Sequence, residues 1–409
     1  MAANTPVRDF FSRNRKVFTL GFVALMISSV GDLLAGATLG SMTGTLSQLA
    51  GLMILIPPAI GMRGNIFGAL GSRLGTAMNI GTFEMSMKKG SLLRQNFEAS
   101  LLLTIVMSFL MGIMAAGIAT LLGVEAAGME VFVFISVIGG TLAGIVLVFI
   151  NILVASVGFK RGWDIDNFSA PIITAAGDVV TLPMLFLAAI LVQDDLIPMP
   201  LIDAFAVALL VIAGYLVWRV MRMPLNETKR IFIQTAPVLV LCILLDIGAG
   251  LIIDNELETL VASAALLVII PPFLEDANAL GGILTSRLSS MLHMGLLAPK
   301  RIPDKIALEN FAIIYIFGLW VFTLVGVTAY IVALALGLES PSLISMVGLS
   351  LFAGLLTVTA LNLISYYVAI YTFKFNLDPD DHSIPITSSA IDLVGAIFFI
   401  GTVMMLGGF

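Results

Sequence analysis

The sequence contains little charge, almost no histidine and a single cysteine. Charged residues make up 11% of its 409 residues, whereas soluble domains carry about 25%. The lone Cys242 excludes an internal disulfide and a thiolate metal cluster, and two histidines are too few for a multi-histidine metal centre. No GxxxxGK[ST] phosphate loop occurs, so nothing indicates ATP-driven pumping. With 59% hydrophobic residues, the chain is predicted to be an all-α polytopic membrane protein that contacts the lipid bilayer and no nucleic acid.

Eleven apolar runs are long enough to cross the roughly 30 Å hydrocarbon core of a bilayer. They are residues 17–39, 44–62, 97–123, 129–158, 168–193, 201–221, 231–253, 257–274, 308–336, 342–373 and 384–407.

The sequence repeats itself at an offset of 214 residues. At this offset Asp32 falls on Asp246 and Asp178 falls on Asp392. Each copy has five spans, an odd number, so a direct fusion would turn the second copy upside down. One extra helix between the copies gives a 5+1+5 plan and restores two parallel repeats, related by a pseudo-two-fold axis along the membrane normal. The expected parts are a segment 1–16, a first repeat 17–200, a link 201–230 and a second repeat 231–409.

The distribution of lysine and arginine predicts the orientation. All lysine and arginine residues in loops and flanks follow even-numbered spans or precede the first one, while the opposite loops hold only acids. Because cytoplasmic loops are enriched in these cations, we expect a multi-pass protein of the cell membrane. Its N-terminus, including the segment 1–16, is expected to be cytosolic and its C-terminus extracellular.

Four aspartates fall inside the predicted spans and are the candidate metal ligands: Asp32, Asp178, Asp246 and Asp392. An intramembrane charge costs several kcal/mol and is a functional hypothesis by default. No lysine or arginine is expected at that depth, so the acids lack a fixed partner. Cation binding is favoured, and two alternatives stay open: protonated aspartates that hold helices together, and a proton relay. Mg²⁺ prefers oxygen ligands and keeps several waters, which suits opposed carboxylates across a two-fold axis.

Paired prolines interrupt the second and eighth runs, at Pro57-Pro58 and Pro271-Pro272. They are expected to kink or break a helix. The glycines that follow indicate either close helix packing or an exposed backbone turn. In the second case the side chains of Asn65 and Asn278 would help to coordinate an ion.

These segments resemble the MgtE family of magnesium transporters and its tandem relatives, solute carrier family 41. The resemblance rests on PPAIGMRGNIFGALGSRLGTAMNIG (57–81), PPFLEDANALGGILTSRLSSMLHMG (271–295), PIITAAGDVVTLP (171–183) and PITSSAIDLVGAIFF (385–399).

The resemblance implies a five-helix unit used twice around a central ion pathway. It also implies that an aspartate of the fifth helix, Asp178 or Asp392, binds hydrated Mg²⁺. The family's Gly-Asn matches Gly64-Asn65, whereas the second copy has Glu275, Asp276 and Asn278 near this place and Ala279 at the aligned asparagine. Asp276 therefore joins the candidate ligands. Bacterial members carry a cytosolic gating domain, for which the roughly sixteen residues before the first span leave no room.

The function expected from these features is transport of a divalent cation, foremost Mg²⁺, which is the substrate and not a cofactor. Inward movement of a divalent ion is favoured by about 4.6 kcal/mol at 100 mV, so a channel-like or uniport path needs no coupling to another ion. The pseudo-dimer is expected to act as a monomer. A Na⁺-coupled exchanger is the alternative, and an ion-coupled carrier of an organic solute is a further one. An intramembrane aspartyl protease, which also needs two aspartates, is disfavoured because Asp392 follows Ile391 and a PAL motif is missing. The chain is thus not expected to be an enzyme.

Overall fold

The computed structural model describes residues 14–161, 169–194, 196–377 and 382–406, and within these ranges the secondary structure is helical. The helices of the first half and the link are α2 (Arg15–Ser41), α3 (Thr43–Gln48), α4 (Leu52–Asn79), α5 (Leu92–Leu122), α6 (Met129–Arg161), α7 (Ser169–Gln193) and α8 (Met199–Arg222). Those of the second half are α9 (Glu227–Asp254), α10 (Leu257–Ala262), α11 (Ala265–His293), α12 (Lys305–Ala335), α13 (Leu343–Lys374) and α14 (Ile384–Met405).

Eleven of the described helices are long and apolar enough to cross a membrane. The prediction of an all-α polytopic membrane protein with eleven spans is therefore confirmed. The segment 1–16 lies almost entirely outside the described residues, so the structure does not bear on its position. Shifted by 214 residues, the ends of α2 to α7 fall within two residues of the ends of α9 to α14.

The second and eighth spans differ from the predicted ranges 44–62 and 257–274. The short helices α3 and α10 take up the first part of each apolar run, and the spans themselves are α4 and α11. The paired prolines do not break these helices, since both pairs lie inside a continuous helix. They fall near the start of each helix, where Pro58 leaves the carbonyl of Ile54 without its helical donor and Pro272 does the same to Val268.

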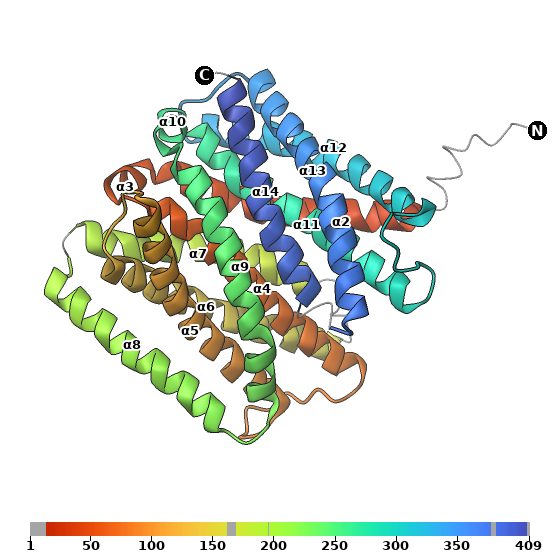
Figure 1. The fold of residues 1–409 in the computed structure, drawn as a ribbon, viewed down its shortest axis with the longest axis horizontal. Coiled ribbons are helices and arrows are strands. Elements are labelled where there is room, and N and C mark those ends of the chain that lie inside the picture. Colours follow the sequence, from red (N-terminus) through yellow and green to blue (C-terminus); the bar gives the residue numbers. More distant parts are fainter. Residues whose placement is uncertain (1–13, 162–168, 195, 378–381, 407–409) are drawn as a thin grey trace, which may run out of the picture.

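The first long helix of each half packs against helices of the other half. The α2 helix packs against α11 and α12, and α9 packs against α4 and α5; in Figure 1 the red α2 lies among the blue helices of the second half. The contacts involve the carbonyls freed by proline: a Cβ atom at Gly250 would lie 2.6 Å from the oxygen of Ile54, and Gly36 approaches the oxygen of Val268 in the same way. Glycine allows this backbone approach because it has no side chain.

The linking helix α8 lies at the edge of the molecule (Figure 1). It contacts α5, α6 and α9, and 17% of its apolar window is buried inside the protein. The centre is therefore left to α2, α4, α7, α9, α11 and α14, and both halves contribute to it.

Candidate functional site

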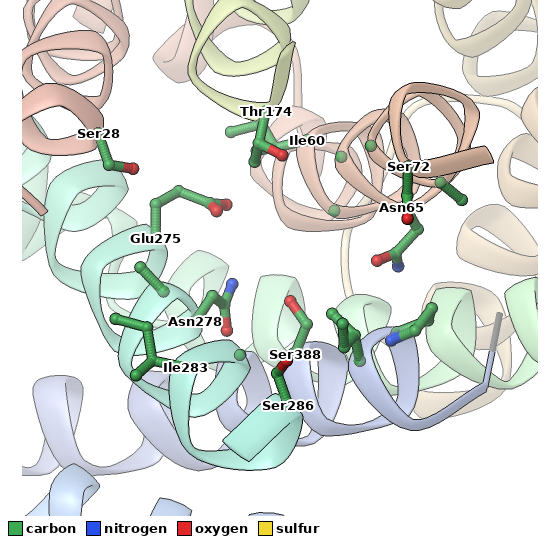
Figure 2. Close-up of a pocket in the computed structure, with 18 of the residues that line it drawn as sticks. Ser28, Ile60, Asn65, Ser72, Thr174, Glu275, Asn278, Ile283, Ser286 and Ser388 are labelled. Atoms are coloured by element: carbon green, nitrogen blue, oxygen red, sulfur yellow. The ribbon is translucent and has the colours of Figure 1, made fainter. Parts of the chain in front are cut away.

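A cavity of about 390 Å³ lies between the two halves. Its lining comes from α2, α4 and α7 of the first half and from α11 and α14 of the second. Many lining residues are partners at the 214-residue offset: Gly64 and Asn278, Gly68 and Gly282, Ser72 and Ser286, Thr174 and Ser388. In Figure 2 polar side chains from both halves point into this space, among them Ser28, Asn65, Glu275 and Asn278.

The four predicted aspartates are buried, and none of them is among the residues that line this cavity. Asp32, Asp178, Asp246 and Asp392 are each exposed by 2% or less. Asp32 accepts a hydrogen bond of 3.3 Å from Ser28 Oγ, and Asp392 accepts one of 2.9 Å from Asn278 Nδ2. The donors, Ser28 and Asn278, line the cavity. These two aspartates are therefore linked to the cavity through a single side chain each.

Gly61 of α4 brings the second-half aspartates together. A Cβ atom at this glycine would lie 3.0 Å from Asp246 Oδ2 and 3.7 Å from Asp392 Oδ2. In the first half Asp32 and Asp178 lie on α2 and α7, which pack against each other. The four buried acids thus lie on two pairs of packed helices, α2 with α7 and α9 with α14.

Several carboxylate oxygens lack a hydrogen-bond donor among the described residues. They are both oxygens of Asp178, both oxygens of Asp246 and Oδ1 of Asp32. Unpaired buried polar atoms cost about 1–3 kcal/mol each, so their retention here indicates a role outside folding. No three histidine, cysteine or acidic side chains of the described part converge closely enough to hold a bare metal ion.

The other predicted ligands differ in placement. Asn65 and Asn278 both line the cavity, and each has a buried amide atom that no described residue satisfies, Nδ2 and Oδ1 respectively. Asp276 is not among the lining residues. Ser29 Oγ of α2 lies 2.8 Å and 2.7 Å from its two carboxylate oxygens, so Asp276 takes part in a buried contact between α2 and α11.

The helix at Asn65 and Asn278 leaves no exposed backbone turn. Both residues lie inside continuous helices, α4 and α11. The interpretation in which an open turn offers its carbonyls to an ion is therefore wrong for this structure, because the helix continues through the prolines and the glycines that follow them. Small residues such as Gly64 and Gly68 instead leave space for the cavity.

A second, much smaller cavity adjoins the first and shares two lining residues with it. Its volume of about 10 Å³ is near the minimum for one water molecule. Ile60 and Glu275 border both cavities, and Asp392 borders the small one. The remaining lining is apolar and comes from both halves: Met53, Ile56, Pro57, Ile253, Ile270, Pro271 and Leu274.

Two charged residues of these helices were not predicted from the sequence. Glu275, which matches Gly61 at the 214-residue offset, lines the large cavity and the small one. Arg63 is 1% exposed inside α4, contrary to the expectation that no lysine or arginine lies at this depth. The error came from ending the span at residue 62. Comparing the two copies for mismatched charges, rather than matched ones, would have found both.

The guanidinium of Arg63 is held by neutral groups. It donates to the carbonyl of Ala59 over 3.2 Å and to Ser108 Oγ over 2.8 Å, and Gly140 leaves room for it. No ion pair joins Arg63 to a carboxylate within the described ranges. The ion pairs formed among the described residues join neither Arg63 nor any other cation to the acids near the cavity.

A bundle of membrane-spanning helices with paired acids around a cavity between two halves is the architecture of a transporter of cations. The profile of the MgtE family, described as a divalent cation transporter, matches the chain twice, over residues 56–188 and 270–402. The chain belongs to the MgtE family. The two matches are separated by the same 214 residues as the repeat, and family membership confirms a transporter rather than an enzyme.

Curated relatives match nearly the whole chain. Solute carrier family 41 member 2 of Gallus gallus is 27% identical over 409 residues, covering 91% of this chain and 67% of the relative. Solute carrier family 41 member 3 of Rattus norvegicus is 24% identical and covers 91% of this chain and 84% of the relative. The human member 2 is 27% identical, with 91% and 67% covered. No solved structure matches this chain significantly.

Proposed function

We propose that this protein carries a hydrated divalent cation, Mg²⁺ foremost, along a central pathway between its two halves. The observation that supports this most is the set of four buried acids, two of which, Asp32 and Asp392, accept hydrogen bonds from residues that line one central cavity. Family membership supplies the class of substrate, a divalent cation.

A hydrated ion fits this arrangement better than a bare one. Mg²⁺ dehydrates reluctantly and usually binds through one or two carboxylates with waters between. The cavity of about 390 Å³ has room for an ion with its waters. Serine, threonine and asparagine groups from both halves offer hydrogen bonds to those waters. Asp178 and Asp392 then provide the charge, supported by Asp32 and Asp246.

In this proposal the large cavity lies on the cytosolic side. Lysine and arginine in the flanks follow the C-terminal ends of α4 and α11, and such loops are retained in the cytosol. In α4 the apolar cavity borders Met53 to Ile60, while the large cavity extends to Ser72. The proposed pathway is therefore open to the cytosol and closed by apolar residues toward the outside, with the two halves parallel.

Flux through this pathway is expected to be channel-like or uniport, because the membrane potential already drives divalent cations inward. A Na⁺-coupled exchanger is the second candidate, since the pathway carries more acids than one divalent ion neutralises. A carrier of an organic solute would instead transport in the absence of divalent cations.

The test is ion flux into proteoliposomes that contain the purified protein. Mg²⁺ uptake is measured with and without a membrane voltage and with and without an opposing Na⁺ gradient. A uniport path responds to voltage alone, whereas an exchanger requires Na⁺ on the opposite side. Absence of divalent flux under every condition contradicts the proposal.

A further inference from the structure

Glu275 distinguishes the second half of the protein from the first. At the 214-residue offset its partner is Gly61, and both residues border the same large cavity. A Cβ atom at Gly61 would lie 3.0 Å from Asp246 Oδ2, which is a tight contact. At this position of the cavity lining the second half carries a carboxylate and the first half carries none.

The position of Glu275 is where the two cavities meet. It borders both the large cavity and the small apolar one. Figure 2 shows its carboxylate pointing into the open space between α11 and α4, not toward the protein interior. No salt bridge neutralises it among the described residues. An ion passing between the cavities meets this carboxylate.

An independent feature of the same place indicates a ligand. Asn278, one helical turn further along α11, is 9% exposed and lines the cavity. Its Nδ2 is engaged by Asp392, but its Oδ1 has no partner among the described residues. An amide oxygen in this state is an acceptor for the water shell of a cation or for the cation itself.

We propose that Glu275 is the specificity-determining residue of this pathway, setting its preference for divalent over monovalent cations at the passage between the two cavities. This inference rests on the proposed function. Its physical basis is that a fixed charge attracts a divalent ion with twice the energy that it gives a monovalent ion at the same distance. Because equilibrium constants depend exponentially on energy, the effect on divalent affinity is the square of the effect on monovalent affinity.

The experiment compares Glu275→Gln with the parent in proteoliposomes, using Mg²⁺, Mn²⁺, Na⁺ and K⁺ as probes. Glutamine keeps the shape and removes the charge. Apparent Mg²⁺ affinity is expected to weaken about tenfold while that for Na⁺ and K⁺ weakens about threefold, so that the divalent preference falls. Equal loss for both classes of ion, or an unchanged preference, overturns the inference.

Two matched controls remove a carboxylate charge elsewhere. Asp276→Asn changes the adjacent residue, which contacts Ser29 instead of the cavity, and is expected to keep the parent's ion preference. Glu98→Gln changes an exposed residue paired with Arg94 and is expected to leave flux unaltered. A loss of divalent preference in the Asp276→Asn variant equal to that in Glu275→Gln contradicts the assignment to Glu275.

Failure of the inference and of the proposed function give different results. If Asp178→Ala abolishes divalent flux while Glu275→Gln transports with the parent's preference, only the role of Glu275 is wrong. If neither variant alters flux, the pathway itself is wrong. Should Glu275→Gln fail to fold, Glu275→Asp keeps the charge but shortens its reach, and is expected to change the order of preference among Mg²⁺, Mn²⁺ and Ca²⁺; an unchanged order overturns the inference.

Discussion

Asn278 donates a 2.9 Å hydrogen bond from its side-chain nitrogen to Oδ1 of Asp392. The two residues come from α11 and α14, and Asn278 lines the central cavity while Asp392 borders the smaller apolar one. The bond fixes the carboxylate at the meeting point of the two cavities. Asp178, the partner of Asp392 in the first half, has no such donor among the described residues.

Removal of this donor is expected to weaken ion binding without abolishing transport. In Asn278→Leu the carboxylate of Asp392 loses its fixed orientation and the site loses the free Oδ1. The loss of a hydrogen bond to a charged group, about 1.5–3 kcal/mol, corresponds to roughly a tenfold to hundredfold weaker apparent Mg²⁺ affinity. Initial uptake rates at a series of Mg²⁺ concentrations measure this change, and an affinity equal to the parent's contradicts the role of Asn278.

The contact between Gly250 and the carbonyl of Ile54 is expected to hold the two halves together. A methyl group at Gly250 would lie 2.6 Å from that oxygen, so Gly250→Ala forces α9 away from α4. Overpacking of this kind costs about 1–3 kcal/mol. The thermal unfolding midpoint in detergent should fall accordingly.

Gly117→Ala is the matched control for this prediction. It lies in α5, and a Cβ atom there would meet nothing within 4 Å. Alanine favours helix over glycine by about 1 kcal/mol, so the midpoint should stay the same or rise. If the unfolding midpoint falls equally in both variants, the loss of stability comes from replacing a helical glycine and not from the contact with Ile54.

The buried contact between Ser29 and Asp276 is expected to stabilise the fold rather than to bind the transported ion. Ser29→Ala leaves the Asp276 carboxylate without the donor seen 2.7–2.8 Å away. The unfolding midpoint should drop by an amount that reflects about 1–3 kcal/mol, while the Mg²⁺ affinity of the folded protein stays the same. A weaker affinity at unchanged stability would place Asp276 in the pathway.

The apolar residues around the small cavity are expected to block leakage. Ile56 and Ile270, partners at the 214-residue offset, are 2% and 4% exposed and border this constriction. Hydrophobic constrictions close a pathway by excluding water. Serine at both positions should therefore raise ion leakage, measured in proteoliposomes without a Na⁺ gradient. Leakage equal to that of the parent would show that the barrier lies elsewhere.

The sequence allowed the eleven spans to be predicted, because they depend on local composition, and the four aspartates predicted inside them are buried in the structure. It did not predict the placement of Asp276, since Ser29 is remote in sequence and reaches it only because α2 packs against the other half. The continuous course of α4 was also not predicted, because proline is unfavourable in a helix. Pro57 and Pro58 lie in the first part of α4, and the carbonyl of Ile54, which Pro58 leaves without a donor, lies against Gly250. Because the predicted span ended at residue 62, Arg63 was not counted among the residues of the membrane interior.

Asp178 and Asp392 are proposed to bind the transported ion together. Mg²⁺ flux is therefore measured in proteoliposomes that contain Asp178→Ala or Asp392→Ala, with Glu98→Gln as the control for purification and insertion. Each alanine variant is expected to reduce flux to the level of protein-free liposomes, while the control matches the parent. Parental flux through either folded alanine variant would show that these two carboxylates do not bind the ion.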